Sequence, residues 1–114
     1  MNELSKTERR ELARQARDAF PPMGIYAIRH RSGGRVILGS SRNVPAALNR
    51  AQFELRMGTH ADRDLQAEWN RQGADGILFE VVELLKERQD PDFDYAGELK
   101  ALEAVHSELQ GLAP

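Results

Sequence analysis

The sequence contains no cysteine in its 114 residues. This absence excludes a disulfide framework, a thiolate metal site and a cysteine nucleophile, and any metal must bind carboxylate, imidazole or water. Long apolar runs are also missing at the start of the chain, where MNELSKTERRELARQARDAF is charged throughout. That stretch provides neither the apolar core of a signal peptide nor a membrane span of about 18 residues. We therefore expect a soluble, cytoplasmic protein without membrane association, and the length predicts one globular domain.

Charge is distributed unevenly along the chain, although the net charge is only −2. Residues 1–57 contain eleven Lys/Arg and five Asp/Glu, whereas residues 58–114 contain five and thirteen, so the two halves carry +6 and −8. A basic first half suits a polyanion such as a nucleic acid. Ordinary solvated helix surfaces produce the same asymmetry, so charge alone does not require a nucleic-acid partner.

The N-terminal segment has the pattern of an amphipathic helix over residues 5–19. Ser5 and Glu8 form a capping-box pair, and two prolines at positions 21–22 prevent the helix from continuing. We therefore predict a helical extension over residues 1–22, followed by a globular domain over residues 23–114. The apolar positions of the extension are Leu12, Ala13, Ala16 and Phe20.

Residues 24–39 have the sequence pattern of a β-hairpin. GIYAIRH, residues 24–30, alternates and is rich in β-branched side chains, as strands are. SGGR at 32–35 supplies glycines for the turn, and VILG at 36–39 is the returning strand.

Two helices, a strand and a last helix complete the predicted order αββααβα. Pro45 and Gly58 bracket the first of these helices, Thr59 or Asp62 starts the second, and Asp94 caps the last. ILFEVVELL, residues 77–85, is the most apolar segment, and we expect it to be the central strand. The fold class is α+β, a small three-stranded antiparallel sheet flanked by helices. Expected apolar positions of the three helices are Ala47, Leu48, Ala51, Phe53, Leu55 and Met57, then Leu65 and Trp69, then Leu99, Leu102, Val105, Leu109 and Leu112.

Four segments in order resemble the GIY-YIG endonuclease family. They are GIY at 24–26, ILG followed by SSRN at 37–43, the stretch GTHADRDLQAEWNRQGADGILFEVVE at 58–83, and LKALEAVH at 99–106. The resemblance covers residues 23–109 and implies a GIY-YIG-like fold for that region. It also implies a hydrolase that cleaves phosphodiester bonds with a divalent metal such as Mg²⁺, a hairpin tyrosine pair and a helix arginine.

The family's functional positions are only partly matched. Tyr26 corresponds to the first tyrosine and Glu103 to the metal-binding glutamate. Ile37 replaces the second tyrosine, Ala47 replaces the arginine, and Ala51 replaces a position that often carries His or Tyr. Losing a positioned acid or base costs about 10²–10⁴ in rate, and losing the cation that meets phosphoryl charge costs about 10³–10⁵.

The interpretation that follows is a GIY-YIG-fold domain that binds DNA or RNA and has a degenerate nuclease site. The expected nucleic-acid contacts are Arg29, Arg31, Arg35, Arg42 and Arg50, with Ser40 and Ser41 as donors to a phosphate. A turn into a helix explains the two serines without any ligand, and this is the favoured interpretation. Histidines 30, 60 and 106 share no ligand spacing and are expected to be surface or satisfied side chains.

Two alternatives stay open at the level of the sequence. In the first, the chain is an active Mg²⁺-dependent endonuclease in which Tyr26 orients water, Glu103 holds the metal and Arg50 substitutes for the missing arginine. In the second, it is a protein-interaction module whose N-terminal helix docks a partner protein or forms a homodimer.

Overall fold

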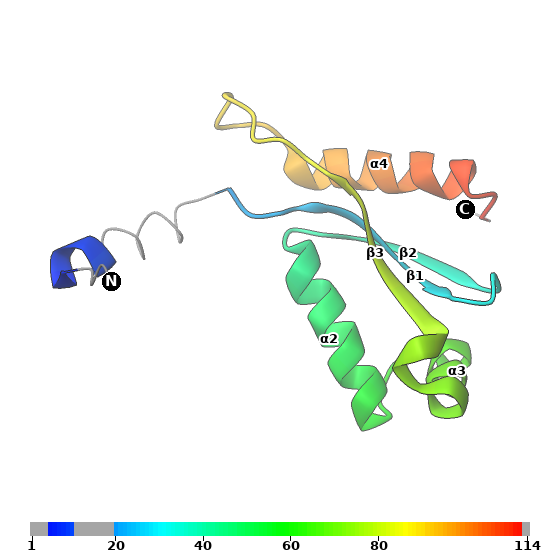
Figure 1. Ribbon diagram of the computed structural model, residues 1–114. Coiled ribbons are helices and arrows are strands. Elements are labelled where there is room, and N and C mark those ends of the chain that lie inside the picture. The colour runs from blue at the N-terminus through cyan, green and yellow to red at the C-terminus, as the bar shows by residue number, and fades with distance from the viewer. Residues whose placement is uncertain (1–4, 11–19, 113–114) are drawn as a thin grey trace.

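The computed structural model describes residues 5–10 and 20–112. Strands β1 (Gly24–His30) and β2 (Val36–Ser41) come first, followed by helices α2 (Val44–Met57) and α3 (Arg63–Gln72). A short 3₁₀ helix, η1 (Gly73–Gly76), leads into β3 (Ile77–Leu84), and α4 (Tyr95–Leu109) ends the fold. Helices α2 and α3 lie on one side of the sheet and α4 on the other (Figure 1). This arrangement confirms the predicted α+β architecture and element order from residue 24 onward.

The sheet is antiparallel throughout and has the order β2-β1-β3. The expectation that residues 77–85 form the central strand is therefore wrong, because β1 holds the centre and β3 lies at an edge. The apolar residues of β3 are therefore not explained by a central place in the sheet. Ile77 and Phe79 belong to the core, whereas Val81 and Leu84 are about half exposed on an uncovered part of the sheet.

The hairpin has the register that places the two family motifs side by side. Tyr26 is directly opposite Gly39, and Ile28 is opposite Ile37. Gly33 adopts a positive φ of 88° in the turn, as the predicted turn chemistry requires. A register shift between Ile25 and Tyr26 in the pairing with β3 adds a local irregularity to the central strand.

Each of the three helices begins with a side-chain cap, and the caps at Asp62 and Asp94 are at positions that the sequence predicted. Asn43 accepts a hydrogen bond from the Ala46 amide (3.1 Å), Asp62 from Leu65 (3.0 Å) and Asp94 from Gly97 (2.9 Å). At the other end of α2, Gly58 takes the left-handed conformation and stops the helix. The chain then turns back at once toward α3.

The core lies between the sheet and helices α2 and α3. Its buried members are Ile28, Val44, Leu48, Ala51, Leu55, Leu65 and Ile77, with Tyr26, Ile37, Trp69 and Phe79 packed against them. Phe53 and Met57 were expected on this apolar face, but they are 56% and 61% exposed. Both point outward because the buried stripe of α2 runs through Leu48, Ala51 and Leu55 instead.

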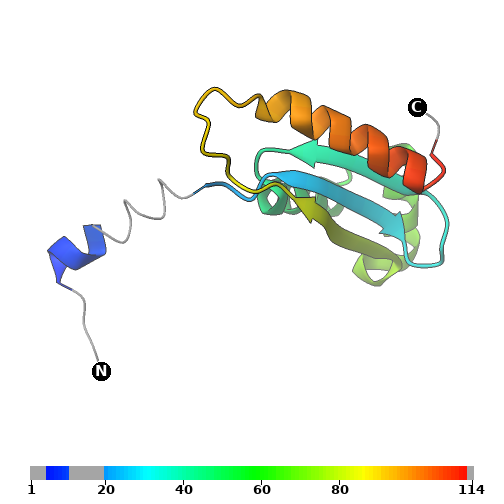
Figure 2. The same ribbon diagram turned by 90° about the horizontal axis from the view of Figure 1, so that it is seen from above.

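Helix α4 packs on the opposite face of the sheet and runs roughly along the direction of the strands, next to β2, in the view from above (Figure 2). Leu99 is buried there, and His106 Nε2 lies 2.8 Å from Glu83 Oε1 on β3. The expected apolar stripe is only partly correct, since Val105 and Leu109 are 49% and 74% exposed. These two side chains lie beyond the face that contacts the sheet.

The buried polar side chains of the described chain meet where α3 packs on the end of β1. Glu68 is 6% exposed and receives hydrogen bonds from the Arg71 guanidinium, one of them 2.7 Å long. His30, also buried, places Nδ1 3.5 Å from Glu68 Oε2, and its Nε2 makes no hydrogen bond with the described residues. The carboxylate of Glu68 therefore holds the hairpin end and α3 together.

At the N-terminus, Ser5 Oγ accepts the Glu8 amide (3.1 Å) and residues 6–10 are helical, in agreement with the predicted cap. The predicted positions Leu12, Ala13 and Ala16 lie outside the described residues. The Phe20 and Tyr95 rings are in tilted contact with centroids 5.3 Å apart, and the Val44 amide donates to the Pro22 carbonyl (2.9 Å), so residues 20–22 already contact the domain. No helix in the described part of the chain is long and apolar enough to cross a membrane.

Candidate functional site

The site is centred on Tyr26, which projects from the middle of β1 on the side of α2. Its ring lies over Gly39 of β2, where an added Cβ would stand 2.4 Å from both Cζ and Oη of the tyrosine. A glycine at this position therefore provides the space in which the aromatic ring crosses the neighbouring strand. The ring packs against the core and remains half-buried, so its hydroxyl marks the boundary between core and solvent.

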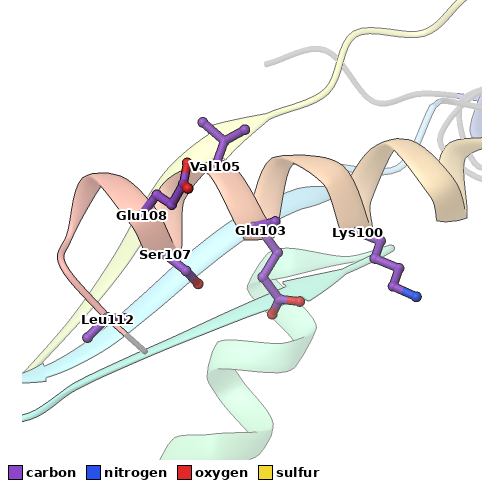
Figure 3. Close-up of a pocket in the computed structure, with 7 residues that line it drawn as sticks. Lys100, Glu103, Val105, Ser107, Glu108 and Leu112 are labelled. Carbon is purple, nitrogen blue, oxygen red and sulfur yellow. The ribbon is translucent and has the colours of Figure 1, made fainter. Parts of the chain in front are cut away.

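Glu103 approaches Tyr26 from the other layer of the fold. It projects from α4, and Figure 3 shows its side chain pointing toward β2 and the start of α2. Burial, and after it the negative charge of Glu103, raises the pKa of the Tyr26 hydroxyl above its ordinary value of 10.0. The two family-matched side chains thus interact electrostatically, although they come from a strand and a helix on opposite sides of the sheet. Within residues 5–10 and 20–112, the side chain of Glu103 makes no hydrogen bond or ion pair.

A groove of about 580 Å³ opens beside Tyr26, between the hairpin and α2. Its apolar surface includes Ile37 and Ala47, which the sequence aligned with the missing tyrosine and arginine, and Ala51 one turn further along α2. Ile37 also packs against the core. The remaining lining residues are Ile28, Ser41, Arg42, Asn43, Ala46, Arg50, Glu54 and His60.

Two of the five predicted arginines line this groove. Arg42 is exposed in the loop before α2 and makes no ion pair or hydrogen bond with the part of the chain that the structure describes. The Arg50 side chain is 81% exposed, and its Nε lies 3.8 Å from Glu54 Oε2, a loose pair on the helix surface. Both guanidinium groups are therefore free to meet an anion in the groove.

The other three predicted arginines lie elsewhere and have partners. Arg29 Nε is 2.6 Å from Glu80 Oε1, and Arg35 is 2.9 Å from Asp62 Oδ2. Arg31 donates to the Asp75 carbonyl at 2.7 Å. The structure consequently separates Arg29, Arg31 and Arg35 from the Tyr26 groove.

The two predicted serines point to opposite faces of β2. Ser41 pairs with Gly24 and shares the groove side with Tyr26, whereas Ser40 pairs with Ile25 and faces the α4 side. The Ser41 hydroxyl accepts the Asn43 amide and donates to its carbonyl, both at 3.0 Å. It is thus occupied in the turn that leads into α2, as the alternative interpretation of these serines expected.

His60 lines the groove, although the sequence gave no reason to select it. Its Nδ1 accepts a hydrogen bond from the Asp62 amide (3.0 Å), so the neutral ring carries its proton on Nε2. The ring comes close to the site because Gly58 ends α2 and the chain turns back over residues 59–62. The sequence predicted that Gly58 ends α2, but it did not predict the direction in which the chain turns afterwards.

Two solved structures are similar to this chain. The catalytic domain of the homing endonuclease I-TevI matches with a TM-score of 0.58 and 22% sequence identity, covering 76% of this chain and 86% of that chain. A mutant of the I-TevI catalytic domain, in which a glutamate is replaced by alanine, matches with a TM-score of 0.50 and 24% identity, covering 80% and 91%. I-TevI is a GIY-YIG homing endonuclease, and this chain has a GIY-YIG-like fold. No protein-family model and no curated protein matches the sequence.

The donor set suits a weakly held, hydrated cation better than a closed metal cage. Across the described residues, no three His, Asp or Glu side chains gather to form a metal centre. Mg²⁺ usually keeps several waters and is held by one or two carboxylates together with substrate phosphates. The unpaired carboxylate of Glu103 fits that role.

Proposed function

We propose that this domain binds DNA or RNA through the Tyr26 groove and that its nuclease site is degenerate. The observation that carries the proposal is the composition of one groove. Tyr26, His60 and two exposed arginines line it, and Glu103 acts on Tyr26 from α4. The two positions at which the family resemblance demands a second tyrosine and an arginine present the hydrocarbon side chains of Ile37 and Ala47.

The remaining polar groups suit a phosphate better than a proton-transfer reaction. The Tyr26 hydroxyl is protonated near neutral pH, as an ordinary tyrosine is, and acts as a hydrogen-bond donor, while its raised pKa further disfavours the phenolate form. The Nε2 proton of His60 provides a second donor. Arg42 and Arg50 add charge-assisted contacts to a phosphodiester backbone.

A divalent metal, when bound, would supply Lewis-acid polarisation of a phosphate oxygen. Glu103 is the residue that would hold it. Hydrolysis also needs a group that handles the proton of the attacking water and a cation at the developing negative charge. The side chains of Ile37 and Ala47 provide neither.

The test is a paired assay on labelled single-stranded and double-stranded DNA and RNA. Gel shifts at several salt concentrations measure binding, and incubation of the same substrates with and without Mg²⁺ or Mn²⁺ measures cleavage. We expect salt-dependent binding and no cleavage. R42A and R50A should each weaken binding and reduce the salt slope by about 1. R56A is the matched control, because it removes one charge from α2 outside the groove.

Three results would contradict the proposal. Binding without a salt slope would remove the nucleic-acid assignment, and binding unaffected by R42A and R50A would place the nucleic acid outside the Tyr26 groove. Metal-dependent cleavage that E103A abolishes would establish the second candidate, an active endonuclease. The position of Arg50 in the groove favours that candidate, since Arg50 is the guanidinium that would replace the missing arginine.

A further inference from the structure

An exposed row of side chains on α2 continues from the Tyr26 groove toward the end of the helix. Ala46, Arg50, Phe53 and Met57 are spaced three or four residues apart, so they lie in line along one side of α2. Ala46 and Arg50 line the groove, and Phe53 and Met57 follow them beyond it. All four residues are exposed, and we call them the outer stripe.

Phe53 is the large apolar side chain of the outer stripe, and the core does not use it. The buried residues of α2, among them Ala51 and Leu55, lie on the opposite side of the helix. The Phe53 ring contacts no other aromatic ring and no cationic group in the part of the chain that the structure describes. Its outer side faces solvent away from the sheet and α3 (Figure 1). The ring is therefore accessible to a flat partner.

The spacing of Phe53 and Arg50 suits a single nucleotide. Three residues separate them, which corresponds to about 4.5 Å along the helix axis and about 5–6 Å between their Cβ atoms. A phosphate and the base of the same nucleotide are separated by a comparable distance. A strand whose phosphate contacts Arg50 can thus place its base over the Phe53 ring.

We propose that Phe53 stacks on an unpaired base and that the outer stripe makes the domain selective for single-stranded DNA or RNA. The inference rests on the proposed function, because it takes the phosphates to be bound by Arg42 and Arg50. Aromatic side chains beside a cationic groove are the surface that single strands require, since every base has a face that can stack. In a duplex these faces are covered by neighbouring bases.

The charge of this region favours a nucleic acid over a protein partner. Residues 42–57 contain three arginines and one glutamate, so the segment carries a net charge of +2. The apolar part of the outer stripe consists of Phe53 and Met57, which is enough for one base and small for a stable protein interface. A polyanion with flat apolar groups matches both properties.

Fluorescence anisotropy of the full chain with three labelled probes of equal length provides the test. The probes are a single strand, the duplex of the same sequence and a single strand of abasic nucleotides, which keeps the phosphates and lacks the bases. The wild type should bind the single strand more tightly than the duplex or the abasic strand. F53A should weaken single-strand binding by about tenfold, the effect typical of base–aromatic stacking, and leave the other two affinities unchanged.

Two further variants separate stacking from general apolar contact. F53W keeps an aromatic face and should bind the single strand as tightly as the wild type. F53L keeps apolar volume without an aromatic face and should behave like F53A. V105A is the matched control, because it removes an exposed apolar side chain from α4 on the other side of the sheet. Circular dichroism of each variant reports its folding.

Several results would overturn the inference. If F53A leaves single-strand binding unchanged, or weakens all three probes equally, Phe53 does not stack on a base. The proposed function survives that result when binding depends on salt and R42A weakens it. Absence of binding to every probe would overturn both proposals. Wild-type dimers in sedimentation velocity that F53A dissociates would assign the outer stripe to contact between copies of this chain.

Discussion

Tyr26 and Gly39 face each other across two paired strands, and the aromatic ring occupies the space where a side chain on residue 39 would be. Gly39 is required because the Tyr26 ring fills the space beside it. Its own backbone does not require a glycine, since its φ is not positive. The orientation of the tyrosine hydroxyl in the groove therefore depends on a residue that itself has no side chain.

Replacing Gly39 with alanine should displace the Tyr26 ring from β2. The new methyl group would overlap Cζ and Oη, and overpacking of this kind costs about 1–3 kcal/mol. Chemical denaturation measures the loss of stability, and the aromatic NMR signals of Tyr26 report its displacement. S40A is the matched control, because it changes the next residue of β2 on the opposite face. An unchanged tyrosine environment in G39A would refute the described packing.

The Glu103 charge should be detectable in the titration of Tyr26. E103Q removes the negative charge, so the pKa of Tyr26 should fall toward 10.0 but stay above it, because burial remains. Phenolate absorbance measures this shift best in a Y95F background, since Tyr95 is the other tyrosine of the chain. E98Q is a control on the same helix. An identical Tyr26 titration in the presence and absence of the Glu103 charge would contradict the proximity of the two groups.

The raised pKa of Tyr26 also predicts how stability depends on alkaline pH. The folded protein holds the Tyr26 proton more tightly than the unfolded chain, so this stabilisation is complete below pH 10.0 and is lost as the pH rises through the folded-state pKa. Urea denaturation at several alkaline pH values should show a steeper decline for the wild type than for Y26F. Equal slopes for the two proteins would argue against the shift.

Arg71 should contribute to stability through the buried carboxylate of Glu68. R71A leaves that carboxylate with His30 alone, and we expect a loss of about 1–2 kcal/mol in the free energy of unfolding. R63A is the control, because it removes an exposed arginine from the same helix. If R63A and R71A unfold alike, the Glu68 interaction has no net effect on stability.

If Ile37 and Ala47 are the reason that the nuclease site is degenerate, introducing the family's tyrosine and arginine at these two positions should restore cleavage. I37Y combined with A47R should cleave nucleic acid with Mg²⁺ at least about 100-fold faster than the wild type. E103A in the same background should abolish this gain. N49R replaces A47R in the control, since it adds the same group to α2 outside the groove. A folded I37Y/A47R protein without activity would place the defect at another residue.

Local signals predicted the hairpin and the helix caps correctly because each depends on neighbouring residues. The turn at Gly33 and the caps at Asp62 and Asp94 all act within a few positions of the chain. Strand order is different, since it is decided by pairing between distant segments. The apolar content of residues 77–85 was read as burial on both faces, whereas β3 is an edge strand with an uncovered end.

The difference between local signals and contacts of distant segments also applies to the candidate functional site. The match of Tyr26 and Glu103 to family motifs came from the sequence, but their interaction appears only when α4 packs on the sheet. His60 was missed because a loop, and not a periodic pattern, brings it to the groove. The sequence already singled out Arg50 as a substitute for the missing arginine, but only the fold shows that Arg42 and Arg50 line the groove and that Arg29, Arg31 and Arg35 have partners elsewhere.

Ile37 lines the groove and also packs against the core, so a change at this residue affects both the chemistry of the groove and the stability of the fold. A tyrosine at position 37 would need its hydroxyl exposed to water, whereas the aliphatic side chain of Ile37 has no such requirement. Any variant that regains chemistry at residue 37 should therefore give up part of its resistance to heat. A designer of new activities on this scaffold should first reinforce the packing of Leu48 and Leu55 and only then alter residue 37.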